Sequence, residues 1–92
     1  MSAKPARLVL RLYVAGRAPN SLRAISNLEA ICGAHFTGHQ LEIVDMLKEP
    51  RRAMADRIIV TPTLLKVLPL PAGRVIGDLS DTAQVLLVLG TV

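Results

Sequence analysis

Ile58–Ser80 (IIVTPTLLKVLPLPAGRVIGDLS) is the stretch that decides the fold. It contains three of the six prolines and two of the six glycines. Because proline disfavours helix at the preceding residue, Thr61 and Leu68 are pushed toward extended backbone. The stretch therefore predicts a short strand, a turn at the prolines and a second strand at Arg74–Ile76. Each X-Pro bond can also isomerise, at modest equilibrium cost but over tens of seconds or longer.

The segment at the start of the chain predicts a strand and then a helix. In Arg7–Val14, apolar residues alternate with others, which is typical of a strand with one face in the core. Pro19-Asn20-Ser21 is good helix-starting chemistry. The expected helix ends between Gly33 and Gly38, and its apolar face is formed by Leu22, Ile25, Leu28 and Cys32.

The middle of the chain repeats this order. Leu41–Asp45 predicts a second strand, and Pro50 begins a second helix, where its missing N–H costs nothing. We expect Met54 and Ile58 to anchor that short helix. Strand, helix, strand and helix in succession predict an α/β fold with a right-handed βαβ unit and a mixed sheet. With 92 residues, the chain is expected to form one domain over 1–92.

Two short apolar segments are compatible with either helix or strand. Asp78 or Ser80 is placed to cap a helix over Thr82–Leu89, yet Val85–Leu89 is equally plausible as a buried strand. Leu64–Leu68 has the same ambiguity in reverse. Periodicity cannot decide between the alternatives for runs this short, so both stay open.

Composition and charge limit the class of protein. Hydrophobic residues make up 51% of the chain, with one Phe, one Tyr and no Trp, so the core must be aliphatic. No run approaches the roughly 18 apolar residues of a membrane span, and no signal-peptide pattern follows Met1, so we expect a soluble, cytoplasmic protein. The net charge of +4 comes from scattered Arg and Lys without aromatic platforms. This favours a solvated basic surface or an acidic protein partner over nucleic acid.

The sequence offers no catalytic or metal-binding constellation. Cys32 is the only cysteine, so an internal disulfide is impossible, and on an apolar helix face a core role is expected. His35 and His39 lack a third ligand nearby in sequence and are interpreted as exposed loop residues. The carboxylates of Asp45, Asp56 and Asp78 are isolated and are expected to be caps or surface charges. We therefore expect no enzyme activity, no cofactor and no metal.

Several motifs, in one order and spacing over nearly the whole chain, resemble a known family. The start resembles KaiB, the circadian clock protein of cyanobacteria, and its relatives in other bacteria, through Leu12-Tyr13-Val14-Ala15-Gly16, Pro19-Asn20-Ser21 and Arg23-Ala24. The middle resembles KaiB through Val44–Lys48 and Pro50. The second half does so through Thr61–Leu64, Lys66, Pro69, Pro71, Arg74 and Ile76–Ser80.

The resemblance implies a non-enzymatic clock protein that changes fold. KaiB-like proteins bind the N-terminal ATPase ring of the hexameric kinase KaiC and, where KaiA exists, hold KaiA inactive. They bind in a thioredoxin-like fold, βαβαββα, whereas the resting protein has the order βαββααβ and forms a tetramer or dimer. The place of a redox Cys-x-x-Cys is occupied here by Ala15–Asn20, without a thiol. The residues linked to the fold switch are Pro62, Pro69, Pro71 and Val88.

The resemblance also implies a partner-binding set. Positions linked to KaiC binding in the family correspond here to Arg23, Arg57, Thr63, Lys66 and Arg74. Without the resemblance, each charge would be interpreted as solvated, and Thr63 as a strand residue. The chain departs from the usual family pattern at Glu42, Leu70, Gly73, Val88 and Gly90. The alternative hypothesis is a thioredoxin-like sensor domain of a SasA-type histidine kinase, and a redox or phosphoryl-transfer role ranks third.

Val88 gives the fold switch its most direct test. Valine in place of glycine gains only a few tenths of a kcal/mol in a helix, but up to about 1 kcal/mol in a strand. We therefore expect the free protein to occupy mostly the resting fold, from which a partner selects a minor thioredoxin-like population. The substitution Val88→Ala should shift the balance toward the helical form.

Overall fold

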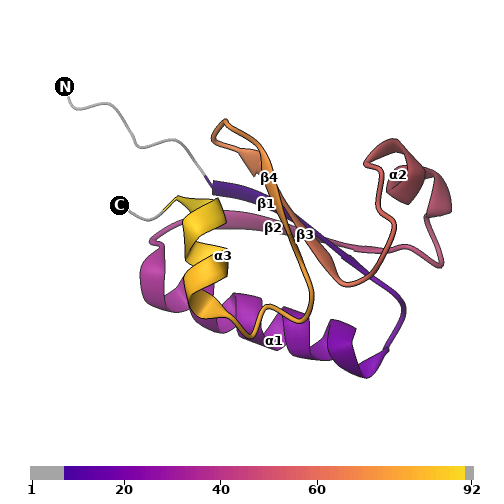
Figure 1. Cartoon of the computed structure of the whole chain (residues 1–92), viewed down its shortest axis with the longest axis horizontal. Coiled ribbons are helices and arrows are strands. Elements are labelled where there is room, and N and C mark those ends of the chain that lie inside the picture. Colours follow the sequence, from indigo (N-terminus) through magenta and orange to yellow (C-terminus); the bar gives the residue numbers. More distant parts are fainter. Residues whose placement is uncertain (1–7, 91–92) are drawn as a thin grey trace.

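A computed structural model describes residues 8–90 of the chain (Figure 1). The elements follow in the order strand, helix, strand, helix, strand, strand, helix. Their bounds are β1 Leu8–Val14, α1 Pro19–His35, β2 His39–Asp45, α2 Pro50–Ala55, β3 Thr63–Leu68, β4 Gly73–Ile76 and α3 Thr82–Leu89. This is the βαβαββα order of the thioredoxin-like arrangement, and of the two predicted arrangements it is the one that the structure shows.

The four strands form one mixed sheet in the order β2-β1-β3-β4. Strand β1 pairs parallel with β2 and antiparallel with β3, and β3 pairs antiparallel with β4. A mixed sheet in a small α/β domain was predicted and is confirmed. The antiparallel β3–β4 pair follows from the short proline-containing connection after β3, because a short turn can join only antiparallel neighbours.

The two faces of the sheet carry separate hydrophobic clusters. One face of β1, formed by Leu8, Leu10, Leu12 and Val14, packs with residues of α1 and α3. The opposite face carries a smaller cluster of Tyr13, Val44, Ala53 and Ile58, which packs α2 against the sheet. Below, the face under α1 and α3 is called the helical face, and the face under α2 the outer face. The predicted alternation along β1 is confirmed.

The phase of α1 differs from the prediction. Leu22 was expected in the core but is 45% exposed, whereas its neighbour Ser21 is buried. Ser21 occupies the inward position because its hydroxyl accepts a hydrogen bond from the backbone N–H of Ala15, at 3.2 Å. The helix ends at His35, within the predicted interval between Gly33 and Gly38, so its end is confirmed and only its phase differs. His35 ends α1 and His39 begins β2, so their predicted placement in a loop was wrong, whereas their predicted exposure is confirmed.

Helix α2 is anchored by Ala53 rather than by Met54. Met54 is 77% exposed, whereas Ala53 is buried beside Ile58. The helix has only six residues, so a shift by one position changes which side chain meets the sheet. The expected role of Ile58 is confirmed, and that of Met54 is wrong.

The two ambiguous segments are now assigned. Leu64–Leu68 belongs to strand β3, and Val85–Leu89 belongs to helix α3. The side chain of Asp81 caps α3 by accepting a hydrogen bond from the N–H of Gln84, at 3.2 Å. Asp78 instead accepts from the N–H of Ser80, so neither of the two expected caps was the right one. At the other end, Gly90 adopts a left-handed φ of 81° and donates its N–H to the carbonyl of Leu86.

The proline-rich stretch has three cis peptide bonds, at Thr61–Pro62, Leu68–Pro69 and Leu70–Pro71. They lie at the beginning of β3 and in the connection from β3 to β4. In the part of the chain that the structure describes, no helix combines the length and apolarity needed to span a bilayer.

Candidate partner-binding site

The outer face of the sheet carries a hollow over β1, β3 and β4. Its volume is about 480 Å³, and its lining residues are Arg11, Asp56, Leu65, Lys66, Val67, Ala72, Gly73 and Arg74. Arg11 and Arg74 both lie opposite Leu65 across the sheet, from β1 and from β4 respectively. The hollow therefore joins the guanidinium groups of Arg11 and Arg74 and the carboxylate of Asp56 over an apolar floor. Such a surface suits a partner that presents both acidic and aliphatic side chains.

Arg74 is held by backbone rather than by an acid. Its guanidinium donates hydrogen bonds to the carbonyl oxygens of Asp56, at 2.9 Å, and of Arg57, at 3.1 Å. Within residues 8–90, no carboxylate lies within ion-pair distance of Arg74. The positive charge of this exposed side chain is therefore oriented but not neutralised.

Arg57 lies directly beside Arg74 and ends the α2 region. Its φ of 57° is left-handed, which reverses the chain after α2. The turn is closed by hydrogen bonds from the Arg57 N–H to the Met54 carbonyl, at 3.0 Å, and from the Ile58 N–H to the Ala53 carbonyl, at 2.8 Å. The Arg57 side chain is exposed. The structure thus brings the backbone of one predicted site residue into direct contact with the guanidinium of another.

Thr63 and Lys66 are both buried. Thr63 is 1% exposed, and its hydroxyl donates to the carbonyl of Val60 at 2.7 Å, which fixes the loop before β3. Lys66 is 7% exposed. It lies two residues beyond the core residue Leu64, so it belongs to the helical face and not to the outer face with Arg74. The interpretation of Lys66 as a solvated charge is therefore wrong.

Arg23 lies in the helical layer, on α1. Its Nε is 3.5 Å from Asp78 Oδ2, and its NH2 group donates to the side-chain oxygen of Asn20. Arg23 is exposed but does not join Arg57 and Arg74. Of the five predicted partner-binding residues, the structure brings only Arg57 and Arg74 into direct contact. Thr63 shares the outer face with Leu65 but is buried.

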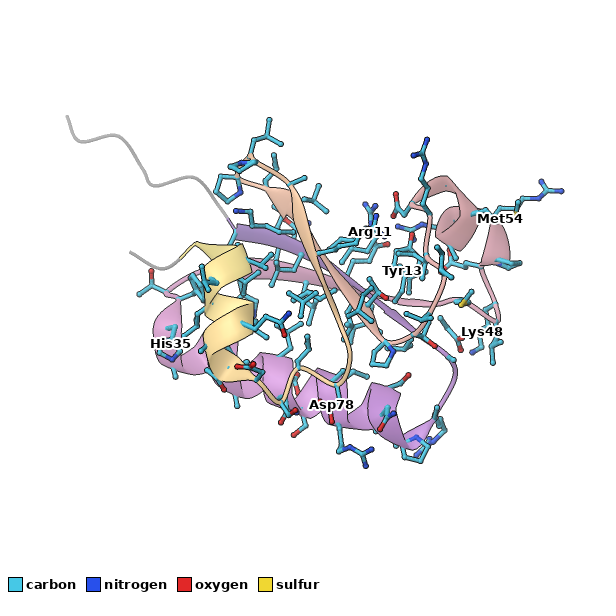
Figure 2. The ribbon with its side chains drawn as sticks, in the orientation of Figure 1. Arg11, Tyr13, His35, Lys48, Met54 and Asp78 are labelled. Carbon is cyan, nitrogen blue, oxygen red and sulfur yellow. The ribbon has the colours of Figure 1, made fainter. Side chains whose placement is uncertain are left out.

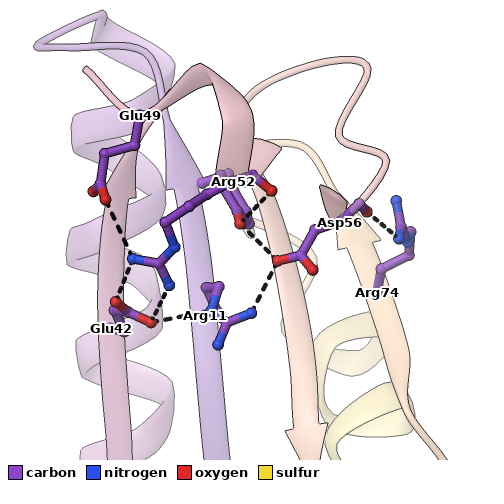
Figure 3. Close-up of polar contacts among 7 residues, drawn as sticks. Arg11, Glu42, Glu49, Arg52, Asp56 and Arg74 are labelled. Carbon is purple, nitrogen blue, oxygen red and sulfur yellow. Dashed lines mark hydrogen bonds and ion pairs between the residues drawn. The ribbon is translucent and has the colours of Figure 1, made fainter. Parts of the chain in front are cut away.

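A polar cluster beside the hollow links β1, β2 and α2 (Figure 3). Arg52 binds both carboxylate oxygens of Glu42, at 2.6 and 2.7 Å. Arg11 reaches Glu42 at 3.0 Å and Asp56 at 2.9 Å. The buried hydroxyl of Tyr13 donates to Asp56 Oδ2 at 2.6 Å. The cluster is connected to the Arg74 site through Asp56, whose side chain binds Tyr13 while its carbonyl binds Arg74.

The contacts within this cluster shift the pKa values of its ionisable groups. Hydrogen bonds from Arg52 are the main cause that lowers the pKa of Glu42 to about 2. The hydrogen bond from Tyr13 is the main cause that lowers the pKa of Asp56. Burial, followed by the contact with Asp56, raises the pKa of Tyr13 to about 12. At neutral pH both carboxylates are therefore ionised and the phenol is neutral.

Sequence reasoning missed this cluster. The alternation along β1 places Arg11 and Tyr13 on one face, but Asp56 is 45 residues from Arg11 and 43 from Tyr13. The only signal was the presence of an arginine and a tyrosine on the strand face opposite the aliphatic one. These two residue types implied that a polar group or another element covers this face of β1, but they did not identify it.

The remaining candidate groups have structural roles. Cys32 is fully buried, and burial raises the pKa of its thiol. The side chain of Asp45 accepts from the N–H groups of Gly16, at 3.0 Å, and Leu47, at 2.9 Å, and so holds the β1–α1 loop. Across residues 8–90, His, Cys, Asp and Glu nowhere form a group of three that is able to hold a metal ion. Figure 2 shows His35 and Lys48 at opposite ends of the molecule.

Comparisons with known proteins agree with this architecture. The N-terminal domain of Synechococcus elongatus SasA superposes with a TM-score of 0.78 and 26% identity, over 97% of this chain and 89% of that one. Chloroplastic thioredoxin z superposes with a TM-score of 0.72 and 22% identity, over 91% and 76% of the two chains. At that identity the second likeness shows only the fold, which is thioredoxin-like.

Sequence comparison identifies the family. Residues 11–91 match the family model described as the KaiB domain. The circadian clock oscillator protein KaiB of Synechococcus elongatus is 52% identical over 80 residues, which cover 86% of this chain and 78% of that protein. The protein of the same name from Prochlorococcus marinus subsp. pastoris is 50% identical over 80 residues, covering 86% and 75%. The chain belongs to the KaiB family.

Proposed function

We propose that this chain is a non-catalytic clock or timing protein that binds the N-terminal ATPase ring of a KaiC-type kinase and modulates its phosphorylation cycle. Membership of the KaiB family supports a clock role. The observation that carries the binding proposal is the outer-face site, where Arg74 is exposed, oriented by two carbonyls and paired with no carboxylate among residues 8–90. Arg57 lies beside Arg74. Arg23 and Thr63 also belong to the proposed partner-binding set but do not contact Arg74.

The chemistry of the chain supports a binding role over a redox one. Disulfide exchange needs a thiolate and a resolving thiol, but the chain has a single cysteine. Its thiol is buried, and burial raises its pKa, which disfavours the reactive thiolate. We propose that the chain acts in the cytoplasm, through the surface that it presents and without a cofactor.

Charge complementarity defines the partner's surface. The net charge of +4, and an Arg74 that pairs with no carboxylate among residues 8–90, favour a ring that presents acidic side chains to this site. Exposed charges at the rim of an interface mainly increase the association rate, and salt screens that effect. Where a KaiA exists, the bound chain would also engage it, as the family resemblance implies.

We infer that the chain also adopts the resting order βαββααβ as a tetramer or dimer. The support is local: Leu64–Leu68 and Val85–Leu89 are compatible with strand or helix by sequence, so their state depends on tertiary packing. The KaiC-type partner would then select the thioredoxin-like arrangement from two populations.

A second candidate is a sensor domain of a SasA-type histidine kinase. It is favoured by the TM-score of 0.78 to the SasA N-terminal domain, whose identity of 26% is half that of the KaiB relatives. Sequencing the full reading frame distinguishes the two, because a sensor domain would be followed by kinase domains.

The experiment is a binding titration of the parent and Arg74→Glu with a purified KaiC-type ATPase ring. At low salt, Arg74→Glu should slow association, and raising the salt should shrink the difference from the parent. Arg17→Glu is the matched control, since it makes the same charge change on an exposed residue of the β1–α1 loop. Equal association of the parent and Arg74→Glu at low salt would remove Arg74 from the site. No association of the parent would refute the proposed function.

A further inference from the structure

We propose that Lys66 and Gly73 form a seat for the C-terminal half of α3, and that Lys66 is a positioning residue that holds this segment helical rather than a contact residue for the partner. The inference deepens the proposed function and rests on it only where partner binding is the readout. It concerns the helical face of the β3–β4 pair, behind the hollow that holds Arg74.

The register places the two residues together under α3. Lys66 and Gly73 are direct cross-strand partners in β3 and β4. The adjacent inward pair, Leu64 and Val75, is buried in the same cluster as Val85 and Leu89 of α3. Side chains two residues apart on a strand share a face, so Lys66 and Gly73 continue this surface toward the end of α3. Figure 1 shows α3 lying along this edge of the sheet.

Gly73 allows α3 to approach the sheet closely. A Cβ atom at position 73 would lie 2.8 Å from Cγ1 of Val88, which is shorter than real Cβ contacts. Glycine in a strand often marks such a close approach of another segment. Any side chain at position 73 would therefore force the side chain of Val88 to shift and disturb the packing of α3 on β4.

Lys66 supplies the charge that this end of the helix lacks. Its Nζ lies 3.8 Å from the Cβ position of Gly90, the C-cap of α3. The last carbonyls of a helix lack intrahelical partners and carry a partial negative charge, which a cation stabilises. Helix α3 has no basic residue in its own last turn. Within residues 8–90, Lys66 also has no carboxylate at ion-pair distance.

Burial gives Lys66 a second structural role. Because the side chain is only 7% exposed, its aliphatic stem covers the core while its ammonium group reaches the helix end. A partner that approaches the outer face meets Arg74, which lies on the other side of the sheet. Loss of Lys66 should therefore act on partner binding through the state of α3.

Hydrogen exchange followed by NMR on the thioredoxin-like peak set of the free protein, the set in which α3 is a helix, tests the seat directly. Lys66→Met keeps the stem and removes the charge, and should accelerate amide exchange in Val85–Leu89 about two- to fivefold, which corresponds to the usual strength of a helix-end charge. Exchange is normalised to β1 to remove global unfolding. Lys48→Met, at an exposed lysine before α2, is the matched control and should leave α3 unchanged.

A pair of variants tests the close approach. Gly73→Ala should also accelerate exchange in α3, and Gly73→Ala combined with Val88→Ala should restore protection relative to Gly73→Ala alone, because the second change removes the clashing Cγ1. If Gly73→Ala alone does not fold, folding of the double variant supports the same conclusion. Protection in Gly73→Ala equal to that of the parent would overturn the role of Gly73.

Binding separates this inference from the proposed function. With the KaiC-type ATPase ring as probe, Lys66→Met should weaken affinity while leaving the salt dependence of the association rate as in the parent. Unchanged exchange in α3 together with a reduced salt dependence would make Lys66 a contact residue and overturn the proposal, while the proposed function would stand. Faster exchange in α3, with no binding by any variant including the parent, would support the seat and refute the proposed function.

Discussion

Replacing Tyr13 by Phe removes one hydroxyl and should destabilise the fold measurably. Tyr13 is fully buried, and its hydroxyl donates to the ionised carboxylate of Asp56 at 2.6 Å. That carboxylate keeps its ion pair with Arg11, at 2.9 Å. The hydroxyl also lies 3.0 Å from the carbonyl oxygen of Arg52, which still accepts from the N–H of Asp56. The substitution therefore removes a charge-assisted hydrogen bond without leaving an isolated charge.

The structure sets the size of the effect. Hydrogen bonds to charged groups contribute about 1.5–3 kcal/mol. The side chain of Asp56 is 26% exposed, so water can replace part of the lost bond. We expect the free energy of unfolding of Tyr13→Phe to fall by about 1–2 kcal/mol, which is at or just below the lower end of that range. In a domain of this size that corresponds to a decrease in Tm of about 5–15 °C.

The effect should depend on pH. Because the folded pKa of Asp56 lies below its ordinary value, its carboxylate contributes stability above the unfolded pKa, about 3.9. This contribution is lost as the pH falls through the folded pKa. The bond to Tyr13 is the largest cause of that shift. The difference between Tyr13→Phe and the parent should therefore be largest near neutral pH and shrink below about pH 4.

Urea unfolding at pH 7 and at pH 3, for the parent and Tyr13→Phe, measures both quantities. Asp56→Asn and the double variant complete a mutant cycle that isolates the coupling between the two side chains. A cycle with no coupling at pH 7, or a difference that grows as the pH falls, would refute the reasoning. NMR titration of Asp56 in Tyr13→Phe should show its pKa moving back up toward the ordinary value.

Four further outcomes follow from the structure. Cys32→Ala should lower the free energy of unfolding by about 1 kcal/mol, because the thiol is fully buried, and should leave partner binding intact. Loss of binding in a variant that remains folded would instead reveal a role for thiol chemistry. Gly77→Ala should destabilise the fold by about 1–3 kcal/mol because the φ of Gly77 is 117°. Gly33→Ala should instead stabilise it by up to about 1 kcal/mol, because Gly33 lies inside α1 with open space around it. Changes in Tm of the same sign for the two variants would contradict this. The pKa of the Glu42 carboxylate is lowered to about 2, so the carboxylate should stabilise the fold above its ordinary pKa and lose that contribution as the pH falls toward 2. Glu42→Gln should therefore make the free energy of unfolding fall less steeply between about pH 4 and pH 2. Val88→Ala should shift the free protein toward the helical arrangement, which would be seen as a change in the relative intensities of two NMR peak sets. A single thioredoxin-like peak set that the substitution does not alter would contradict this.

Local patterns predicted most of the elements. The alternation in β1 and the helix start at Pro19 depend on short-range chemistry, and both are confirmed. The position of Pro50 at the start of α2 is confirmed for the same reason. These features depend on residues that are neighbours in sequence or lie one helical turn apart.

The rest depends on contacts between distant residues. Leu64–Leu68 and Val85–Leu89 take strand and helix because each packs on a shared core, which no local propensity specifies. The burial of Lys66 follows from the position of the end of α3. Likewise, the Arg11–Asp56 pair joins β1 to the end of α2 across 45 residues of sequence. The sequence therefore indicated which residue types to consider for the site, but it did not indicate which of those residues lie next to one another.

The central claim is that the outer face, with Arg57 and Arg74, binds a KaiC-type ATPase ring while the chain keeps the arrangement described here. Hydrogen exchange of the chain with and without the purified ring tests it most directly. The account predicts new protection over 56–61 and in β4, with α3 protected as a helix in the complex. Unchanged exchange in both of those segments at saturating ring concentration would contradict it.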